Sequence, residues 1–470
     1  MNITQEKPRE ECGVFGIALN EKDDFNVAAL TRTALFSLQH RGQESAGIVT
    51  NDRGKFNSYK NTGLVNEVFT EETMRNLAGK KAIGHVRYSA AGAAALENAQ
   101  PLVIWHLGGN LAVAHNGCIT NAEAMRQEFE RSGAIFQTLS DSEVIAYAIV
   151  RERLNSNSIE EAIKKAMNKL EGAYSIVAMG PNKVVAARDP NGFRPLCIGK
   201  LGESYCVASE TCALDAIGAE FLRDVNPGEI IVLDNGELRS YDSGLKGKPG
   251  LCVFEFVYFA RPDSTIDGIG VDMSRQMVGR FLAKESPVEA DLVVGVPDSG
   301  ISAAIGYSYE SGIPYSMGMV KNRYIGRTFI QTSQRQREDS VRLKLSPVTE
   351  NIKGKRIVLV DDSIVRGTTC ARIIKMLREA GAAEVHMRIA SPPFRHPCYF
   401  GTDISSRDAL IANHHSIEEI RRIIGTDTLA YLSIEAMREI ACMGTLKGGC
   451  VGCFTGKYPI KVEGEEICEE

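Results

Sequence analysis

Residues 356–377, RIVLVDDSIVRGTTCARIIKML, constrain the fold more than any other stretch of the sequence. A continuous apolar run ends in two carboxylates, a short loop containing Gly367 follows, and an amphipathic helical segment comes next. The apolar run DLVVGVP at 291–297 also leads into a glycine-containing turn and a helical segment. Strands that are apolar on both faces, each followed by a helix, are typical of helix-covered parallel sheets. We therefore expect an α/β domain with a parallel sheet from about residue 250 onward.

The preceding part of the chain has a different pattern. From residue 12 to about 240, short strand-like runs alternate with glycine-rich turns, as in VFGIAL, SAGIVT, KAIGHVRYS, NLAVAHNGCIT, YSIVAMG and EIIVLDNGELRSY. Helical patches occur at 121–133, where Asn121 is the expected N-cap, and at 141–154. Strands that outnumber helices and arrive in runs favour an α+β sandwich. The Gly/Pro/Lys-rich stretch 241–250 separates the two patterns, so we predict domains at 12–245 and 246–470.

Length and charge limit the classes of function. The 470 residues exceed the ~250–300 at which single cores stop growing, so two or three domains are expected. The net charge of −5 provides no overall attraction for nucleic acid or an anionic membrane. The first residues lack a secretory signal pattern, and no apolar run approaches the ~20 residues of a membrane helix. We expect a cytoplasmic protein, in which twelve cysteines indicate metal binding or catalysis rather than disulfides.

The loop after the acid pair has the features of a phosphate site. A loop entering a helix N-terminus offers unpaired backbone N–H groups and a favourable dipole to a phosphate, and Gly367 lets the backbone come close. Asp361 and Asp362 would repel a phosphate, so they suit hydroxyl groups or a bridging divalent cation. A phosphorylated ribose fits both halves of the motif. The alternative is an ordinary strand-to-helix turn in which Asp and Ser cap the helix. A Walker loop is excluded, because the Gly-Lys-Ser/Thr ending of that motif is absent.

These residues resemble the phosphoribosyl pyrophosphate (PRPP) signature of type I phosphoribosyltransferases. The resemblance implies that the acid pair holds the ribose hydroxyls and that the 5′-phosphate is bound by Ser363, Ile364, Val365, Arg366, Gly367, Thr368 and Thr369. Ser299 follows the other apolar strand at the same sheet edge and is expected to join Asp361 and Asp362 in holding one Mg²⁺ per subunit. A basic stretch at 321–345 is expected to bind pyrophosphate, chiefly through Lys321 and Arg327. A solvated charged loop is the alternative for that stretch.

Cys12 precedes the apolar run GVFGIAL and follows the polar stretch MNITQEKPREE. An isolated cysteine in such a place is usually a small buried hydrophobe. Downstream, however, five segments place polar or charged residues at glycine-rich strand ends, where site residues tend to project: LQHRGQESAG, GHVRYS, NAQPL, AHNG and SDSE. These five downstream segments favour a catalytic site that includes Cys12.

The five segments resemble the glutamine amidotransferases whose nucleophile is the N-terminal residue (Ntn type). Together with the PRPP loop they resemble the glutamine phosphoribosylpyrophosphate amidotransferase family, from residue 12 to the C-terminal region. The resemblance implies that one domain hydrolyses glutamine and the other uses the ammonia to displace pyrophosphate from PRPP. The product would be 5-phosphoribosylamine, in the first committed step of purine synthesis. A homotetramer inhibited by purine nucleotides is expected.

The chemistry explains why Cys12 should be the first residue of the working enzyme. Its thiolate needs a nearby base to attack the glutamine amide, and a free α-amine with a pKa near ~7.7–8.0 can serve. An amine locked in a peptide bond cannot. Residues 1–11 are therefore expected to be a propeptide that is removed.

The resemblance assigns further roles in the glutaminase domain. Asn116 and Gly117 are the expected oxyanion hole, although an Asn-Gly pair is also typical of a hairpin turn. Arg87 is expected to bind the glutamine carboxylate and Asp141 its α-ammonium. The family commonly has a threonine where this chain has Ala90, so glutamine affinity depends on whether Ser89 replaces that hydroxyl.

The C-terminal segment contains one Cys-x-x-Cys pair, Cys450 and Cys453. Alone, this pair fits a redox site, half of a zinc site or chance. In one lineage of the resembling family, two distant cysteines complete the ligands of a 4Fe–4S cluster, and Cys252 and Cys398 match them. We expect one such cluster per subunit, with four-cysteine zinc as the alternative. The same lineage carries the propeptide.

Two other functions compete with this interpretation. Another glutamine amidotransferase, of the sugar-phosphate or glutamate synthase type, would share the first domain but lack the PRPP loop. A PRPP-binding regulator would retain the loop but have a decayed glutaminase half. The presence of both motif sets favours the two-site enzyme. Tyr258 and Arg261, near the domain junction, are the residues expected to couple the two sites.

Overall fold

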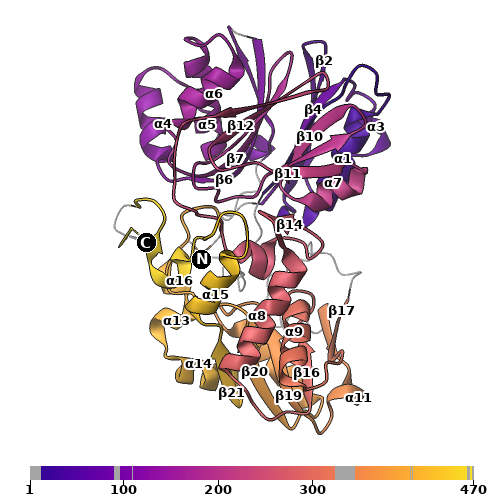
Figure 1. Cartoon of the computed structure of the whole chain (residues 1–470), viewed down its shortest axis with the longest axis vertical. Coiled ribbons are helices and arrows are strands. Elements are labelled where there is room, and N and C mark those ends of the chain that lie inside the picture. The colour runs from indigo at the N-terminus through magenta and orange to yellow at the C-terminus, as the bar shows by residue number, and fades with distance from the viewer. Residues whose placement is uncertain are drawn as a thin grey trace.

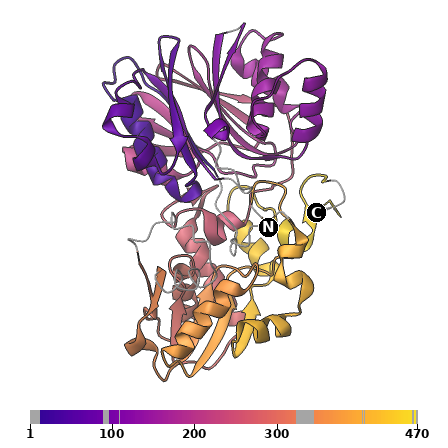
Figure 2. The ribbon, with the colours of Figure 1, turned by 180° about the vertical axis from the view of Figure 1, so that it is seen from behind.

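The computed structural model describes the chain except residues 1–11, 89–95, 108, 323–343, 403, 405, 463–465 and 468–470, with only the backbone of residues 466 and 467. Figures 1 and 2 show two halves, one built on two facing sheets and the other on a smaller sheet flanked by helices. The C-terminal segment, drawn in yellow, lies at the junction of the halves in both views.

The N-terminal half is a sandwich of two antiparallel sheets. The first has the order β11-β9-β10-β1-β4-β2-β3. Its strands are β1 Gly13–Ala18, β2 Ser45–Asp52, β3 Lys55–Thr62, β4 Lys81–Arg87, β9 Cys197–Leu201, β10 Ser204–Ala208 and β11 Glu220–Asp224. The second has the order β13-β12-β8-β7-β6-β5. Its strands are β5 Leu102–His106, β6 Gly109–Ile119, β7 Gly172–Met179, β8 Val184–Arg188, β12 Glu229–Asp234 and β13 Glu237–Asp242.

Helices cover the outer face of each sheet (Figure 1). The first sheet is covered by α1 (Val27–Ser37) and α7 (Thr211–Ile217), and the second by α4 (Ala122–Arg131), α5 (Asp141–Arg153) and α6 (Ile159–Met167). Alternation along β1 explains this layering, because Phe15 and Ile17 face the helices while Val14 and Ala18 fill the space between the sheets. The site-bearing strands β1, β4 and β6 are therefore held in a buried core.

The C-terminal half is a parallel sheet with the order β16-β19-β20-β21, as the apolar runs predicted. Its strands are β16 Leu292–Gly295, β19 Arg356–Asp361, β20 Glu384–Ile389 and β21 Thr428–Tyr431. Val358 and Val360 pack with α8 (Val271–Glu285), α9 (Ile301–Ser311) and α15 (Ile434–Ala441). Ile357 and Leu359 pack on the opposite face with α12 (Thr368–Glu379) and α14 (Ile417–Ile424). The sheet is thus buried on both faces.

Short elements complete the fold. They are α2 Val65–Val68, α3 Glu71–Met74, α11 Thr349–Ile352, α13 Ile411–His414, α16 Gly452–Thr455, a π-helical turn Glu255–Phe259, and the pairs β14 Thr265–Ile266 with β15 Ile269–Gly270, β17 Met319–Lys321 with β18 Leu345–Pro347, and β22 Lys457–Tyr458 with β23 Glu466–Ile467. The π-helical turn and the β14–β15 hairpin contact the N-terminal half through buried ion pairs. Arg41 Nη2 lies 2.6 Å from Glu255 Oε1, and Arg188 Nη2 lies 2.7 Å from Asp267 Oδ2.

Candidate active sites

Cys12 lies directly before β1, at the point where β1 meets the end of β4. Gly13 pairs with Val86, so Cys12 adjoins the Arg87–Tyr88 segment, and its Sγ is 3.7 Å from the Tyr88 carbonyl oxygen. Arg41 Nε donates to the Cys12 carbonyl oxygen at 3.2 Å. The cysteine is only partly buried, whereas the strand after it is fully buried. A rigid strand therefore holds a thiol that remains accessible.

Asn116 and Gly117 lie in β6, on the second sheet. The Asn116 side chain is fully buried, and neither atom of its amide has a hydrogen-bond partner among the described residues. Leaving a buried polar group unsatisfied costs ~1–3 kcal/mol, which a bound ligand can recover. Gly117 has a φ of 137°, a conformation that favours glycine. The Asn116 amide can therefore bond a ligand, and both residues belong to a regular strand rather than to a hairpin turn.

A buried histidine connects β4 to β6 beside these residues. His85 Nε2 lies 3.0 Å from the His115 carbonyl oxygen, so Nε2 carries the proton in this bond. Burial lowers the pKa of His85 to about 3, which keeps the ring neutral at physiological pH. Because His85 stands two residues before Arg87 and His115 directly before Asn116, this bond ties the ends of both strands together.

Asp141 is the first residue of α5, with Ser140 as the N-cap. One carboxylate oxygen accepts a hydrogen bond from the Ile119 N–H at 3.1 Å, which fixes the carboxylate beside the end of β6. Ser142, the next residue, receives a hydrogen bond from Gln100 Nε2 at 2.9 Å, and Gln100 Oε1 accepts from the His115 N–H at 2.8 Å. Asp141 is therefore positioned by the same strand that carries Asn116. Ser89 and Ala90 lie outside the described residues.

Arg41 is a site residue that the sequence analysis did not single out. Its fully buried guanidinium donates to Glu210 at 2.5 Å and to both carboxylate oxygens of Glu255, at 2.6 and 3.0 Å. Burial alone would raise the pKa of Glu210, but His40 and Arg41 outweigh it and hold that pKa below its ordinary value. This network joins the Cys12 carbonyl to the π-helical turn of the other half. The segment LQHRGQESAG is polar in sequence, but only the fold reveals the partners of Arg41.

The two residues proposed for coupling lie near this network. The Arg261 backbone N–H donates to Glu210 Oε2 at 2.9 Å, and its Nη1 donates to Ser37 Oγ at 3.0 Å. Tyr258 lies in the π-helical turn, with its ring centroid 6.0 Å from that of Phe254 in the core of the C-terminal half. Arg261 thus contacts the N-terminal half directly. Coupling by either residue stays a prediction.

The acid pair ends β19 at the carboxyl edge of the parallel sheet. Asp361 and Asp362 are fully buried, and Ser363 Oγ donates to Asp362 at 2.5 Å. Ser299 Oγ donates to Asp361 Oδ1 at 3.4 Å, because β16 and β19 are parallel neighbours and their following loops share one edge. The structure therefore brings Ser299, Asp361 and Asp362 together, as expected.

The loop after the acid pair leads into α12. Gly367 adopts a φ of 81° at the helix N-terminus, and Thr368 is exposed there. Ile364 and Val365 point into the hydrophobic core, so only their backbone N–H groups remain for a phosphate. Arg366 is partly exposed.

The basic stretch is described only at its ends. Lys321 ends β17, and its exposed Nζ lies 2.7 Å from Asp298 Oδ2 in the loop beside Ser299. Arg327 and the other arginines of the stretch lie outside the described residues. The pairing of β17 with β18 brings both ends of the stretch together near this loop.

The four expected ligand cysteines line a single cavity between the halves. Its wall contains Cys252, Cys398, Cys450 and Cys453, with aromatic rings that include Phe193, Phe254, Phe394, Phe400 and Tyr458. Cys252 and Cys450 are opposite each other in an isolated parallel bridge. Burial, and then the three neighbouring thiols, raises the pKa of Cys453 well above its ordinary value. Within the described residues, no three His, Cys, Asp or Glu side chains are arranged around a single metal ion.

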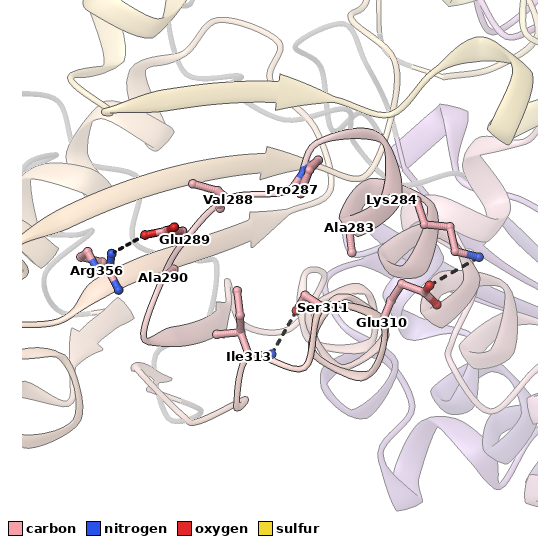
Figure 3. Close-up of a pocket in the computed structure, with 10 residues that line it drawn as sticks. All are labelled: Ala283, Lys284, Pro287, Val288, Glu289, Ala290, Glu310, Ser311, Ile313 and Arg356. Carbon is pink, nitrogen blue, oxygen red and sulfur yellow. Dashed lines mark hydrogen bonds and ion pairs between the residues drawn. The ribbon is translucent and has the colours of Figure 1, made fainter.

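A second hollow lies at the amino edge of the parallel sheet, away from the acid pair (Figure 3). It is bounded by the ends of α8 and α9 and the start of β19. Its charged side chains pair with one another: Lys284 Nζ lies 3.5 Å from Glu310 Oε1, and Arg356 Nη1 lies 3.5 Å from Glu289 Oε2. We assign no substrate to this hollow.

Comparison with known proteins identifies a domain family in each half of the chain. Residues 85–216 match a glutamine amidotransferase domain model, and residues 275–391 match a phosphoribosyl transferase domain model. An amidophosphoribosyltransferase of Archaeoglobus fulgidus is 51% identical over 97% of this chain and 100% of its own length. That of Bacillus subtilis is 50% identical over 96% of this chain and 95% of its own length.

The chain belongs to the amidophosphoribosyltransferase family.

A solved structure supports the same conclusion. The B. subtilis glutamine PRPP amidotransferase complexed with ADP and GMP superposes with a TM-score of 0.89 at 49% identity, over 97% of this chain and 99% of that one. The expected fold class is confirmed: an Ntn-type α+β sandwich joined to a type I phosphoribosyltransferase domain. The expected activity is also confirmed, since amidophosphoribosyltransferases catalyse the first step of purine biosynthesis. The two competing functions are thereby excluded.

None of the helices in the described parts of the chain is both long and apolar enough to cross a bilayer.

Proposed function

We propose that Cys12 is the glutaminase nucleophile and that it acts as the first residue of the mature chain. Its Sγ attacks the side-chain amide carbon of glutamine, and the free α-amine of the same residue takes the thiol proton. The carbon–nitrogen bond then breaks, the departing nitrogen takes that proton and leaves as ammonia, and water hydrolyses the thioester to glutamate. Removal of residues 1–11, which lie outside the described residues, would liberate the amine. The Arg41–Cys12 carbonyl bond supports this role, because it fixes the backbone beside the thiol.

The observation that carries this proposal is the buried, unpartnered amide of Asn116. Asn116 Nδ2 and the Gly117 N–H would donate to the tetrahedral oxyanion, which forms only after attack. Arg87, at the end of β4, would bind the glutamine carboxylate as a fork, and Asp141 would bind the α-ammonium. Asp141 is suited to this role because its carboxylate is already oriented by the Ile119 N–H.

In the other half, Asp361 and Asp362 would bind the ribose hydroxyls of PRPP, and residues 363–369 its 5′-phosphate. The oxygen atoms of Ser299, Asp361 and Asp362 fit Mg²⁺, which is usually held by one or two carboxylates and completed by phosphate and water oxygens. When bound, Mg²⁺ would neutralise pyrophosphate charge. Ammonia forms a bond to the ribose C1 as the bond to pyrophosphate breaks, and it then loses a proton. Residues 326–350, with Lys321 and Arg327, would close over PRPP and exclude water.

We further propose that Cys252, Cys398, Cys450 and Cys453 hold one 4Fe–4S cluster. The fit rests on four thiols that line one aromatic-walled cavity, because four cysteine thiolates are a complete ligand set for such a cluster. No redox step is required by the reaction, so the cluster would have a structural or oxygen-sensing role. Iron and sulfide analysis of an anaerobic preparation tests it, and zinc in colourless protein would contradict it.

The remaining assignments concern organisation and regulation. The glutaminase domain would span 12–245 and the phosphoribosyltransferase domain 246–470, consistent with the sheets that lie on each side of residue 245. Purine nucleotides would inhibit the enzyme, since the B. subtilis relative was solved with ADP and GMP. A cytoplasmic homotetramer is the expected assembly.

Measurement of glutamate release by purified protein, with and without PRPP and Mg²⁺, tests the division of labour. We expect PRPP-dependent glutaminase activity and equal amounts of glutamate and pyrophosphate. Added ammonium should replace glutamine in pyrophosphate release, because the second domain uses only ammonia. Absence of glutamate release with PRPP and Mg²⁺ would contradict the proposal.

A further inference from the structure

The end of β6 is covered by a segment of the C-terminal half. Gly401 has a φ of 115°, and a Cβ built on it would lie 3.3 Å from the Gly117 carbonyl carbon and 3.5 Å from the Gly117 Cα. Gly117 itself has no room for a side chain either, because a Cβ built on it would lie 2.2 Å from the Ala173 carbonyl oxygen in β7. The Gly117 backbone thus runs between β7 and Gly401, with no room for a side chain on either glycine.

The segment that carries Gly401 is held by buried groups of the N-terminal half. Arg194 Nε donates to the Phe400 carbonyl oxygen at 3.1 Å, and the Arg194 side chain is fully buried. The Phe400 ring stacks on Phe193 with centroids 4.1 Å apart. The Arg194 carbonyl oxygen in turn accepts from Arg188 Nε at 2.8 Å and from Ser175 Oγ at 3.3 Å. These contacts leave Phe400 and Gly401 little freedom to move away from β6.

We propose that Gly401 is a positioning residue for the oxyanion hole, supplied by the phosphoribosyltransferase half to the glutaminase half. This inference rests on the proposed role of Asn116 and Gly117. An oxyanion donor must lie ~2.7–3.1 Å from the developing charge, and catalytic groups must be held to within about 0.5 Å. Gly401 leaves room beside the Gly117 backbone only as long as it carries no side chain, so a larger residue at 401 would displace the peptide that follows Asn116. A glycine is required because any side chain would meet the Gly117 backbone or Arg194 Nη2, which is 2.9 Å from the constructed Cβ.

The geometry distinguishes positioning from ordinary packing. Gly401 lies so close to the Gly117 backbone that no side chain fits between them, whereas the Asp141 carboxylate is held from another direction, by the Ile119 N–H. Displacement of Gly117 should therefore weaken transition-state stabilisation and leave binding of the glutamine ammonium unchanged. The phosphoribosyltransferase site is at the carboxyl edge of a different sheet and should not respond.

The test substitutes Gly401 by alanine in the active enzyme as purified. For Gly401→Ala we expect kcat for PRPP-dependent glutamine hydrolysis to fall about 10-fold, a fraction of the ~10²–10³ caused by loss of a whole oxyanion donor. The KM for glutamine and the ammonia-dependent rate should stay within twofold of wild type. Gly425→Ala is the matched control, since Gly425 also has a positive φ, 78°, but has no neighbouring atom within 4 Å of a built Cβ.

A second variant decides the question if Gly401→Ala does not fold. Phe400→Leu removes the ring stacked on Phe193 and leaves the backbone intact. Because Phe400 also lines the cavity of the four cysteines, iron content is measured together with the rates, and at wild-type iron content a smaller loss, about threefold, should fall on glutamine kcat. The inference is overturned if the folded variant matches Gly425→Ala, or if glutamine-dependent and ammonia-dependent rates fall equally. Asn116→Ala separates the two levels of proposal. If Asn116→Ala hydrolyses glutamine at the wild-type rate, the assigned oxyanion hole is wrong. If Asn116→Ala is impaired but the Gly401 and Phe400 variants are not, the oxyanion hole stands and only the positioning role of Gly401 is wrong.

Discussion

The proposed glutaminase site takes its residues from the start of β1, the ends of β4 and β6 and the first turn of α5, whereas the proposed PRPP site has its acid pair and phosphate loop in one continuous stretch, 361–369. The strands of the first set belong to two facing sheets, which bonds such as His85 to His115 cross-link. The second set stands at a sheet edge, beside a hairpin whose strands enclose the basic stretch. The difference indicates one site assembled from separate strands of two sheets and one built from a single loop at a sheet edge.

The sharpest way to separate the two sites is to remove the nucleophile. Cys12→Ala should abolish glutamine-dependent synthesis, with a loss of ~10⁴-fold or more, because no other group can form the thioester. Ammonia-dependent synthesis should remain within twofold of wild type. Parallel rate measurements with glutamine and with ammonium chloride check this result. Equal loss with both nitrogen sources would show that the sites are not separable in this way.

The next largest effect should come from the oxyanion hole. Asn116→Ala removes one donor and should lower glutamine kcat by ~10²–10³, with little change in KM, because the bond forms only in the transition state. Asn116→Asp keeps the size of the side chain and places a negative charge beside the oxyanion, so it should be at least as impaired. A large rise in KM with unchanged kcat would instead assign Asn116 to ground-state binding.

The acid pair provides the opposite test. Asp362→Asn should lower glutamine-dependent and ammonia-dependent synthesis by the same factor, about 10–100-fold, since a hydrogen bond to a charged group is worth ~1.5–3 kcal/mol. The loss should appear mainly in the KM for PRPP. Asp427→Asn, at a partly exposed carboxylate paired with Arg378 far from the acid pair, is a control that should have little effect. A loss confined to glutamine-dependent synthesis would contradict the assigned role.

The difference between the sites also explains what the sequence could predict. The stretch 361–369 was recognisable because its chemistry is contiguous and its strand is apolar on both faces. Asn116 was expected from the family motif, yet only the fold shows that its amide lacks a partner. Arg41, Arg194 and Gly401 act through contacts with residues distant in sequence, which no local pattern specifies.

Local rules were also overridden by tertiary contacts. Asn121 does precede α4 as predicted, but its side chain forms no capping bond and instead donates to the Lys169 carbonyl oxygen at 2.8 Å. The Asn121 side chain also accepts a hydrogen bond from the Glu171 N–H, so its direction is set by the turn before β7 rather than by the helix. Similarly, Ile364 and Val365 belong to the phosphate loop in sequence but to the core in space.

The smallest expected effect is on pH dependence. The folded protein holds the pKa of His85 at about 3, below the ordinary 6.5, so it favours the neutral ring. That stabilisation is complete above pH 6.5 and is lost as the pH falls toward 3, by up to ~1.4 kcal/mol per pH unit. For His85→Gln, thermal unfolding between pH 7.5 and 5.5 should show a shallower decline than for wild type. The exposed His414→Gln is the control and should retain the wild-type slope.

The central claim is that the working enzyme begins at Cys12 and uses its thiol and its own amine. Active protein should be labelled with a diazoketone analogue of glutamine, and its N-terminal peptide should then be identified by mass spectrometry. We predict a peptide that starts at Cys12 with one adduct on Sγ, and loss of glutamine-dependent but not ammonia-dependent synthesis. Full glutamine-dependent activity in protein whose N-terminal peptide still begins at Met1 or Asn2 would contradict the account.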